Sequence, residues 1–365
     1  MLLAIVCSSA VCAADADWRP AKTWVFIVGL LEWKHPDFLR SFPKTGRRDT
    51  LLAELFKENG VPAEQILLLQ DKAATTQEVR ESLKKFAAKA SNGDTLFLYF
   101  CGHGFKGEDG VDYFATYDAY DKGWPVSSIF ETLDKEYPGS RAVLLADCCE
   151  SGVMADLAKS RKSNIQYACL TSVKGSETST GNWTYSDSLL DVLEGKPQAD
   201  LNGDGAITFD EASRYIQNEM RFFEEQTAAA SHSATFPSEF RLALARPRSD
   251  KRIGEHVEVL YDGEWWRALV ETVKDGKLQV RYASAAKREE SWADEKDVRL
   301  FKALATPEPA ALVVGSKAQV EWHHRWWPAR VVKINAAEKK FFITYDGFGK
   351  EWDEWVEAAR IRPKP

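Results

Sequence analysis

The stretch AVLLADCCESG, at residues 142–152, decides the fold of this chain. Its apolar part runs without alternation, which is typical of a strand buried on both faces of a sheet. The run ends at Cys148 and Cys149, and the Ser-Gly pair that follows can open a helix. In an open α/β sheet, ligands and catalytic groups lie at the carboxyl ends of such strands. The stretch therefore predicts a parallel sheet with a functional site at one edge.

A second stretch has the same design. Residues 95–104 read TLFLYFCGHG, an apolar run that stops at His103 between two glycines. Glycines on both sides would let a substrate backbone approach the imidazole. A thiol and an imidazole at the ends of two parallel strands form a candidate nucleophile and base. Taken alone, each has an ordinary structural explanation, because a buried cysteine usually acts as a small apolar residue.

Together the two stretches resemble the signatures of a known family. The segments YFCGHG at residues 99–104 and DCCESG at residues 147–152 are similar to the two motifs of caspase-like cysteine peptidases, especially the bacterial relatives of metacaspases. They stand in the family's order and at its spacing, and the resemblance covers residues 22–245. It implies an α/β fold, the caspase-like three-layer α/β/α sandwich around a mainly parallel sheet.

The resemblance also implies roles for individual residues. Cys149, and not its neighbour Cys148, aligns with the nucleophile, and His103 aligns with the catalytic histidine. A thiolate is the attacking form of cysteine, and the imidazole would promote its formation and later protonate the leaving amine. The backbone N–H groups of Gly104 and Cys149 align with those that hold the oxyanion. No third side chain is evident, and the family does not need one.

Two acidic residues, Asp147 and Asp49, align with the metacaspase pocket that accepts Arg or Lys before the scissile bond. Arg47 and Arg48 stand beside Asp49, so a preference for an acidic residue stays open. The family usually has His after the nucleophile, whereas Glu150 follows here, and Cys-Glu-Ser-Gly resembles the legumain branch of the clan. Cleavage after Asn or Asp is therefore the alternative to cleavage after a basic residue.

The pattern of strands and helices agrees with the resemblance. Apolar runs predict strands, and apolar faces with helical spacing predict helices between them. Thr76 is a candidate cap for the second helix, and Gly60 is a candidate stop for the first. The predicted strands are 23–30, 66–69, 95–101, 142–147 and 165–171, and the predicted helices include 45–59, 126–137 and 211–225. Strands alternating with helices predict a parallel sheet covered on both faces.

Residues 200–211, DLNGDGAITFDE, fit the EF-hand calcium loop at every position. Hard oxygen donors at this spacing suit a calcium ion, and Gly205 would make the sharp turn. The predicted ligands are Asp200, Asn202, Asp204, the carbonyl of Ala206, Thr208 and Glu211. Only one such loop is present and its entering helix is interrupted, so we expect a structural rather than a regulatory ion. An acidic turn without metal is the alternative.

The last third of the chain repeats itself. Trp265-Trp266 matches Trp326-Trp327, and later aromatic positions match in the same order. Short alternating strands predict two small all-β barrels, at residues 253–301 and 314–363. The second unit closely resembles Tudor-type and agenet-type barrels, and the first looks like an eroded copy.

In the Tudor family, aromatic cages bind methylated Lys or Arg by cation–π attraction. The residues that would contribute to such a cage are Trp322, Trp326, Tyr345 and Trp352. The alternative is that these large side chains only fill the core of a small barrel. We interpret the pair of barrels as a module that binds a protein or peptide.

The composition narrows the class of protein. A net charge of −7 over 365 residues, with no Lys/Arg-rich block, argues against a nucleic-acid partner. No apolar run beyond the first residues is long enough to span a membrane. Residues 1–14, MLLAIVCSSAVCAA, resemble a secretory signal peptide and predict a secreted or periplasmic protein. The remaining cysteines have neither disulfide nor zinc spacing, so we expect free thiols.

These observations predict a secreted cysteine endopeptidase that acts on proteins or peptides through Cys149 and His103, needs no cofactor for its chemistry, and carries a structural calcium ion. A catalytically inactive scaffold with the same fold is the main alternative, and a metal-dependent hydrolase is a weaker one. The basic loop at residues 159–163 is either a self-cleavage site or an ordinary solvated loop.

Overall fold

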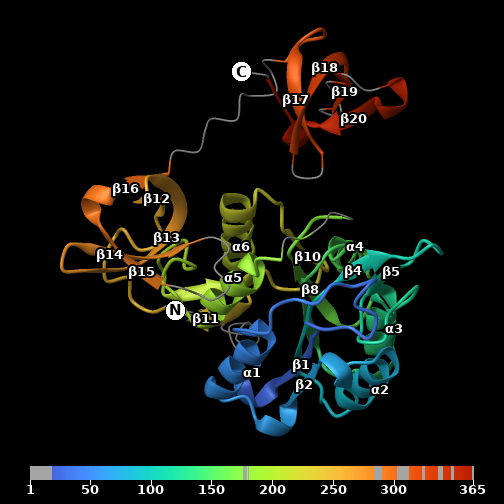
Figure 1. The fold of residues 1–365 in the computed structure, drawn as a ribbon. Helices are drawn as coiled ribbons and strands as arrows, with labels where there is room; N and C mark the ends of the chain where they lie inside the picture. Colours follow the sequence, from blue (N-terminus) through green and yellow to red (C-terminus); the bar gives the residue numbers. More distant parts are fainter. Residues whose placement is uncertain are drawn as a thin grey trace, which may run out of the picture. The chain divides into compact units, whose positions relative to one another are not determined.

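The computed structural model describes residues 19–175, 179, 181–282, 290–301, 312–322, 325–335, 340–346 and 349–363. The predicted signal peptide at residues 1–14 lies outside this range. The chain divides into two compact units, Met1–Leu300 and Phe301–Pro365, and the first barrel belongs to the first unit. Figure 1 shows the elements of each unit. Among the described residues, no helix has the length and apolar character needed to cross a membrane.

A six-stranded sheet in the order β10-β8-β7-β3-β1-β2 forms the centre of the first unit. Its strands are β1 (Thr23–Gly29), β2 (Ile66–Gln70), β3 (Thr95–Cys101), β7 (Arg141–Asp147), β8 (Gln166–Thr171) and β10 (Ala229–His232). Neighbouring strands are parallel except for β10, which runs antiparallel to β8. Every residue of β1, β3 and β7 is buried, as their unbroken apolar runs predict.

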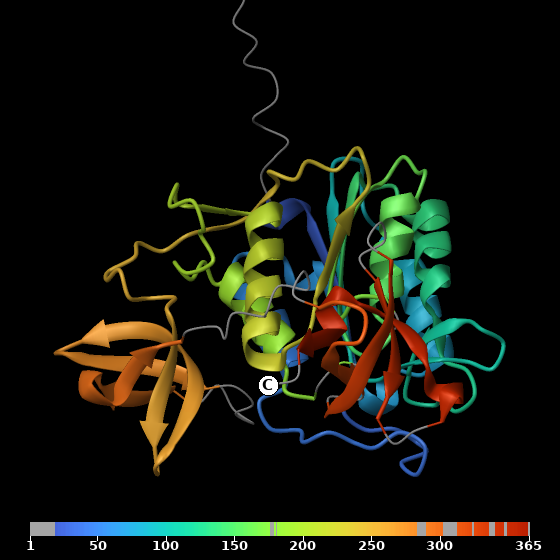
Figure 2. The same ribbon diagram turned by 90° about the horizontal axis from the view of Figure 1, so that it is seen from above.

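Helices cover both faces of this sheet, which confirms the predicted three-layer sandwich. One face carries α1 (Arg48–Glu58), α5 (Thr184–Leu193) and α6 (Phe209–Glu224), and the other carries α2 (Thr76–Ala87), α3 (Val126–Glu136) and α4 (Gly152–Ser160). Figure 2 shows the sheet between the yellow α6 and the cyan and green helices of the other face. Each face encloses its own apolar core, so the sheet is the wall between two cores.

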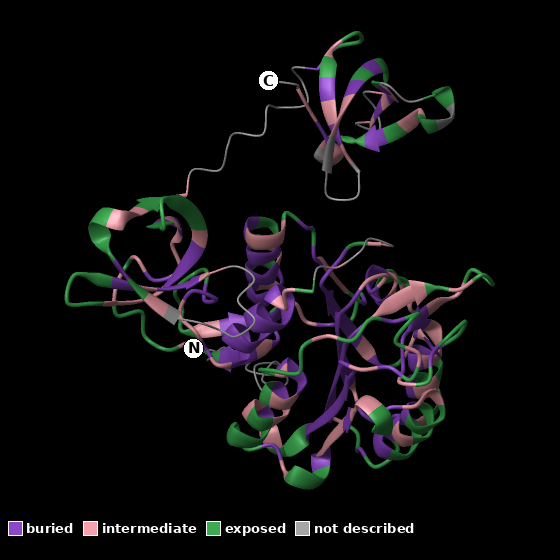
Figure 3. Cartoon of the chain, in the orientation of Figure 1, coloured by how far each residue is buried: buried purple, intermediate pink, exposed green. Residues whose placement is uncertain are grey.

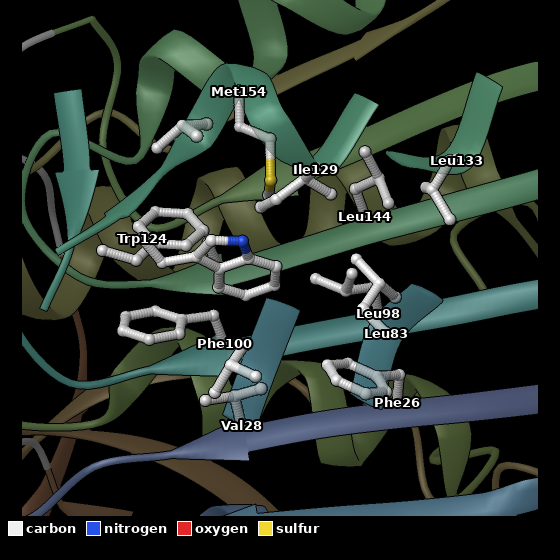
Figure 4. Close-up of a cluster of buried hydrophobic side chains, with 14 of the residues drawn as sticks. Phe26, Val28, Leu83, Leu98, Phe100, Trp124, Ile129, Leu133, Leu144 and Met154 are labelled. Atoms are coloured by element: carbon white, nitrogen blue, oxygen red, sulfur yellow. The ribbon is translucent and has the colours of Figure 1, made fainter. Parts of the chain in front are cut away.

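The core beneath α2, α3 and α4 supports the strands that lead to the site. Figure 4 shows Leu83, Ile129 and Met154 from these helices packed over Leu98 and its neighbours on the strands. Figure 3 shows the same distribution for the whole unit, with buried residues in the central strands and exposed ones on loops and outer helix faces. Close packing of this kind fixes strand ends to a fraction of an ångström.

Two helix starts differ from the predicted positions. Helix α2 is capped by Thr75, whose side chain accepts a hydrogen bond from the backbone N–H of Glu78 3.2 Å away. Thr76, the predicted cap, is instead the first helical residue. Helix α1 begins at Arg48 rather than at residue 45, because Gly46 adopts a positive φ of 64° that cannot continue into a helix.

Short elements complete the first unit. A three-stranded sheet contains β4 (Gly104–Lys106), β5 (Asp112–Phe114) and β6 (Trp124–Pro125), and a two-stranded sheet pairs β9 (Ala206–Thr208) with β11 (Arg241–Leu244). Short 3-10 turns of this unit lie at Pro20–Lys22, Ala63–Gln65, Asp71–Ala73 and Glu295–Asp297, and two more in the second unit lie at Lys350–Trp352 and Ala358–Arg360. Strand β4 begins at the residue after His103, so the imidazole stands at the base of this hairpin.

Each C-terminal barrel is a five-stranded antiparallel sheet, which confirms the predicted β class. The first contains β12 (His256–Tyr261), β13 (Glu264–Lys274), β14 (Lys277–Tyr282), β15 (Glu290–Asp294) and β16 (Val298–Leu300). The second contains β17 (Lys317–Trp322), β18 (Arg325–Asn335), β19 (Lys340–Tyr345), β20 (Glu354–Glu357) and β21 (Ile361–Pro363). Strand order is equivalent in the two, so the internal repeat of the sequence is also a repeat of topology.

The first barrel is attached to the α5–α6 face by ionic contacts. Arg281 on β14 donates to the carboxylate of Asp191 on α5 at 2.5 Å, and both side chains are buried. Arg281 also donates to Glu271 on β13 at 3.0 Å, and Glu271 accepts from Lys196 at the same distance. Buried charges are tolerated only when paired in this way, so the contact fixes the barrel against the helices.

Candidate active site

The register of the sheet brings the two sequence signatures to one edge. Cys101, the last residue of β3, pairs with Asp147 at the end of β7 and with Gly29 at the end of β1. His103 follows β3, and Cys149 follows β7. The carboxyl edge of the sheet therefore carries both candidate catalytic residues, as the pattern predicts.

Gly104 lies directly against the segment that carries Cys149. A Cβ atom built on Gly104 would lie 1.9 Å from the carbonyl oxygen of Cys149, which leaves no room for any side chain there. The structure therefore places the backbones on either side of the predicted dyad in contact. This close approach explains why the residue after His103 is a glycine.

The imidazole of His103 is clamped by a backbone carbonyl and two aromatic rings. Its Nε2 lies 2.8 Å from the carbonyl oxygen of Arg40. A carbonyl oxygen only accepts hydrogen bonds, so Nε2 carries the hydrogen and Nδ1 is left with the basic lone pair. The rings of Trp33 and Phe42 lie with their centroids 4.6 Å from the imidazole. Burial lowers the pKa of His103, and the Arg40 carbonyl only partly opposes this.

Cys149 is the more accessible of the two adjacent cysteines. It lies in the turn before α4, and its Sγ accepts a hydrogen bond from the backbone N–H of Ser179 at 3.1 Å. Burial raises the pKa of the Cys149 thiol, the Ser179 N–H lowers it, and the neighbouring Glu150 carboxylate raises it again. The net rise in the pKa of Cys149 and the lowered pKa of His103 favour a neutral thiol and a neutral imidazole.

The other three described cysteines are buried and inert. Cys101, Cys148 and Cys169 are free thiols, as predicted, and burial holds the pKa of each well above its usual value. Cys148 is 2% exposed and points into the core beneath α3 and α4. A thiol in such surroundings is a poor nucleophile, so the geometry distinguishes Cys149 from its neighbour.

The backbone N–H of Gly104 points away from its strand partner. The N–H of Ala115 donates to the carbonyl oxygen of His103 at 2.9 Å, which makes these two residues a hydrogen-bonded pair across the hairpin. The next pair, Gly104 and Phe114, is then of the non-hydrogen-bonded kind, in which N–H groups face outward. This direction suits the oxyanion role that the resemblance implies for Gly104.

The two predicted pocket acids flank the same strand end. Asp49 is 1% exposed and receives the Arg47 guanidinium at 2.7 Å. Asp147 accepts from the hydroxyl of Ser186 at 2.5 Å and has no cation among the partners that the described residues provide. Burial raises the pKa of Asp147 to about 6. Asp147 pairs with Cys101 across the sheet, and the Asp49 carboxylate lies against Gly29, the partner of Cys101 on the other side.

Arg47 and Arg48, the two cations next to Asp49, have different partners. Arg48 forms a buried two-pronged ion pair with Asp187 on α5, with both distances 3.0 Å. Arg47 reaches Asp49 and also Asp71, at 2.5 Å from the latter. Arg48 thus links α1 to α5, and Arg47 is the cation that partly neutralises Asp49.

The predicted calcium loop is closed by its own side chains. Asp200 accepts the backbone N–H groups of Gly203 at 2.7 Å and Gly205 at 3.0 Å, which wraps the loop around the first ligand position. Glu211 is 2% exposed, and its carboxylate accepts hydrogen bonds from the backbone N–H groups of residues 201 and 202 and of Thr208. Within the described ranges, no three His, Cys, Asp or Glu side chains converge as a preformed metal site would require.

Strand β9 in this loop pairs with β11 instead of with a second calcium loop. Ile207 is fully buried and stands opposite Ala243. The EF-hand loop normally pairs its central strand with that of a partner loop, and here a segment of the same domain takes that place. Besides Asp200 and Glu211, the predicted calcium ligands are the oxygen atoms of Asn202, Asp204, the Ala206 carbonyl and Thr208.

Of the predicted basic loop at residues 159–163, the first two residues belong to the end of α4, and the rest is held to the domain. Arg161 forms an ion pair with Asp134 at 2.5 Å and lies over the ring of Phe130. Ser163 donates to the same carboxylate at 2.7 Å. These contacts favour the interpretation of residues 159–163 as a structural surface loop.

In the second barrel, the four candidate cage residues do not share one environment. Tyr345 is 7% exposed, packs in the barrel core and donates its hydroxyl to Glu354 at 2.8 Å. Its position agrees with the alternative that it fills the core. Trp352 is 45% exposed. Trp322 and Trp326 lie on β17 and β18, and their side chains fall outside the described part of the chain.

Three groups at the site escaped sequence reasoning. The Arg40 carbonyl and the Ser179 amide are backbone atoms, which leave no signal in residue identity. Asp71 is an ordinary acidic residue in sequence, and only the fold brings it to Arg47. Motifs report side chains that are close along the chain, whereas these partners come from distant loops.

Comparisons with known proteins match both parts of the chain. A family model described as "Caspase domain" matches residues 48–302, and one described as "RNA binding activity-knot of a chromodomain", a Tudor-knot, matches residues 312–363. The histone acetyltransferase ESA1 of Eremothecium gossypii is 32% identical over 81 residues, which cover 20% of this chain and only 18% of that protein. A crystal structure of a Geobacter sulfurreducens protein aligns with 62% of this chain and 100% of its own, at 16% identity and a TM-score of 0.43.

Proposed function

This chain belongs to the caspase-domain family, and on that premise we propose that it is a cysteine endopeptidase whose dyad is Cys149 and His103. The observation that carries the proposal is the contact of Gly104 with the Cys149 carbonyl, beside an imidazole whose Nε2 is already bound to the Arg40 carbonyl. Together they supply an accessible thiol, an oriented base and an outward backbone N–H at one strand edge.

The chemistry would begin from the neutral pair. Nδ1 of His103 takes the thiol proton as Sγ of Cys149 forms a bond to the substrate carbonyl carbon. The N–H groups of Gly104 and Cys149 hold the negative oxygen of the tetrahedral intermediate. The C–N bond then breaks, and the imidazolium gives its proton to the leaving amine. Water hydrolyses the thioester by the same steps and restores the thiol.

We propose cleavage after Arg or Lys. Asp147 is supported as the binding carboxylate because its described partners are two hydroxyls and an amide, and a substrate cation would supply a counter-ion. Arg47 and Lys44 face the two carboxylates of Asp49 and Asp71, so Asp147 is the acid of this group with no described cation partner. Cleavage after Asn or Asp, suggested by the Cys-Glu-Ser-Gly segment, is the second candidate.

The test is a library of fluorogenic peptides varied at the residue before the scissile bond. It is run with wild type, Cys149→Ala and the matched control Cys148→Ala, each with calcium and with chelator. We expect cleavage after Arg and Lys that is abolished only in Cys149→Ala. A shift to Asn or Asp substrates would keep the dyad and overturn the basic pocket.

The inactive-scaffold alternative predicts a different result in the same experiment. Wild type would cleave nothing, and a mechanism-based thiol inhibitor would label no residue stoichiometrically. Activity that survives Cys149→Ala but is lost with chelator would instead support a metal-dependent hydrolase. Labelling of wild type that disappears in Cys149→Ala contradicts both alternatives.

For the second barrel we propose binding of a peptide, with the exposed Trp352 in the contact surface. The family that this barrel matches is named for RNA binding, so a single-stranded RNA is the competing ligand. Fluorescence anisotropy with methyl-lysine peptides and with a labelled RNA, on wild type and Trp352→Ala, separates the two. Peptide binding that weakens in the variant supports the proposal, and RNA binding alone overturns it.

We further propose export of the protein and calcium binding by the 200–211 loop. Export is supported by the character of residues 1–14 and is tested by the N-terminal sequence of the mature protein. Calcium is supported by the oxygen donors of the loop and by the turn that Asp200 closes. When bound, the ion would hold this loop together and take no part in the reaction.

A further inference from the structure

One loop holds both halves of the proposed site. Residues 30–47, between β1 and α1, carry the Arg40 carbonyl and the rings of Trp33 and Phe42 that clamp His103. The same loop ends in Arg47, whose guanidinium contacts the pocket acid Asp49. Its conformation therefore decides where the base lies and how much charge surrounds the pocket.

Asp71 is tied to both ends of this loop. Its Oδ1 accepts the backbone N–H groups of Leu31 at 2.8 Å and Glu32 at 3.3 Å. Its Oδ2 accepts Arg47 Nη1 at 2.5 Å, with the ammonium of Lys44 3.5 Å away. Asp71 adopts a φ of 46°, which is unfavourable for a residue with a side chain and is maintained here by these contacts.

The N-terminal end of the loop, at residues 31 and 32, determines where the rings around the imidazole lie. The carbonyl oxygen of Leu31 accepts the N–H of Phe42 at 2.9 Å, and the indole N–H of Trp33 donates to the Ala115 carbonyl at 3.0 Å. Holding residues 31 and 32 thus places both ring walls around His103. A carboxylate does this firmly, because a charge-assisted hydrogen bond is stronger than a neutral one.

We propose that Asp71 is a positioning residue that aligns His103 through the 30–47 loop and sets the charge of the substrate pocket through Arg47. The inference rests on the proposed function, since it assigns Asp71 a part in cleavage after basic residues. Asp71 itself would touch neither the substrate nor the reacting atoms. Oδ1 acts on the position of His103, and Oδ2 acts on the charge of the pocket. Different substitutions at Asp71 can therefore test the two effects separately.

Asp71→Asn retains an oxygen that can accept the Leu31 and Glu32 amides but removes the charge that draws Arg47 away from Asp49. Arg47 then neutralises Asp49 more fully, so we expect KM for an Arg substrate to rise roughly five- to tenfold with kcat little changed. Asp71→Ala removes both contacts. We expect kcat to fall as well, by about 10²-fold if the imidazole shifts by about 1 Å.

Asp94 provides the matched control. It is a buried acid that also accepts one backbone N–H and one side-chain N–H, from Ser91 at 2.8 Å and Trp24 at 2.9 Å. It precedes β3 and so lies at the opposite end of the strands from the site. Asp94→Asn should lower the melting temperature while kcat and KM of the folded enzyme stay at wild-type values.

The experiment measures kcat, KM and melting temperature for wild type and the three variants with one Arg and one uncharged substrate. The proposal requires that Asp71→Asn raises KM only for the Arg substrate and that Asp71→Ala also lowers kcat for both. Asp71 variants that lose stability like Asp94→Asn but keep both constants would overturn it. Absence of Cys149-dependent cleavage in wild type would overturn the proposed function and this inference with it.

Discussion

The Nε2 atom of His103 lies 2.8 Å from the carbonyl oxygen of Arg40, and this single contact fixes which ring nitrogen is basic. Because the carbonyl can only accept, Nε2 carries the hydrogen and Nδ1 is free to take a proton from a thiol. A backbone carbonyl thus orients this imidazole as a carboxylate orients the histidine of Ser-His-Asp peptidases. The tautomer depends on the path of the loop and not on the identity of residue 40.

The state of the resting dyad leads to a first prediction. Burial raises the pKa of Cys149 and lowers that of His103, so we expect the ligand-free protein to hold a thiol and a neutral imidazole. Alkylation of Cys149 by iodoacetamide should therefore increase with pH into the alkaline range, because only the thiolate reacts. An alkylation rate that is already constant below pH 7 would indicate a preformed ion pair and contradict the prediction.

Glu150 provides the second prediction. Its carboxylate follows Cys149 and raises the pKa of that thiol. Glu150→Gln removes the charge, so the pKa of Cys149 should fall and alkylation at pH 8 should become faster by several-fold. Glu131→Gln, an exposed position on α3, is the control and should leave the rate unchanged. Slower alkylation of the Glu150 variant would show that the carboxylate assists the thiol instead.

A third prediction concerns stability and pH. The pKa of Asp147 is about 6 in the folded protein, against 3.8 for the ordinary group, because the carboxyl is buried. The folded state binds the proton more tightly, so the group's contribution to stability is present below pH 3.8 and is lost as the pH rises through 6. Asp147→Asn should raise the free energy of unfolding at pH 7 by up to about 3 kcal/mol.

Urea unfolding of both proteins at pH 4 and pH 7 measures this difference. The gain should disappear at pH 4, where the wild-type carboxyl is largely protonated. The same variant should cleave Arg substrates poorly, because the proposed counter-ion is gone. A variant that is less stable than wild type at pH 7 would mean that Ser186 and its neighbours stabilise the charged form of Asp147 after all.

The junction between α5 and the first barrel gives a fourth prediction. Arg281→Met takes the guanidinium away from the fully buried Asp191 carboxylate and leaves it the Lys196 ammonium 3.5 Å away, so the stability cost should be at most roughly 3–5 kcal/mol. Arg299→Met, which breaks a half-exposed pair with Glu258, should cost less than about 1 kcal/mol.

Chemical denaturation checks both numbers, and the double variant Asp191→Asn/Arg281→Met should recover part of the loss. Removing both partners eliminates a buried carboxylate that the single variant leaves with less cationic compensation. A double variant no better than the single one would mean that the packing of the arginine stem, and not its charge, holds the barrel.

The calcium proposal yields the fifth prediction. Millimolar calcium should raise the melting temperature, because an ion that binds only the folded loop stabilises it by mass action. Asp204→Ala removes a predicted ligand from an exposed position and should abolish the shift, whereas Asp210→Asn, outside the ligand positions, should keep it. Equal shifts for both variants, or none in wild type, would leave the loop as a turn closed by its own hydrogen bonds.

Much of the architecture could be predicted because it depends on local pattern. The runs 95–101 and 142–147 are apolar at every position, and such strands are stable only when both faces are covered. Helix faces such as Val79, Leu83 and Phe86 identify the covering layer. Exact helix starts were less predictable, since Gly46 and Thr75 determine them by backbone angles and caps that compete with neighbouring residues.

Residue order alone is enough to predict that a thiol and an imidazole end two parallel strands, and that glycine follows the imidazole. Those facts follow from short segments whose conformation is set by their own residues. Only the tertiary structure decided what surrounds them: the Arg40 carbonyl on His103, the amide of Ser179 on Cys149, and Asp71 on Arg47. These partners come from separate loops, and burial between them shifts the pKa values, which depend on the surrounding fold rather than on residue type.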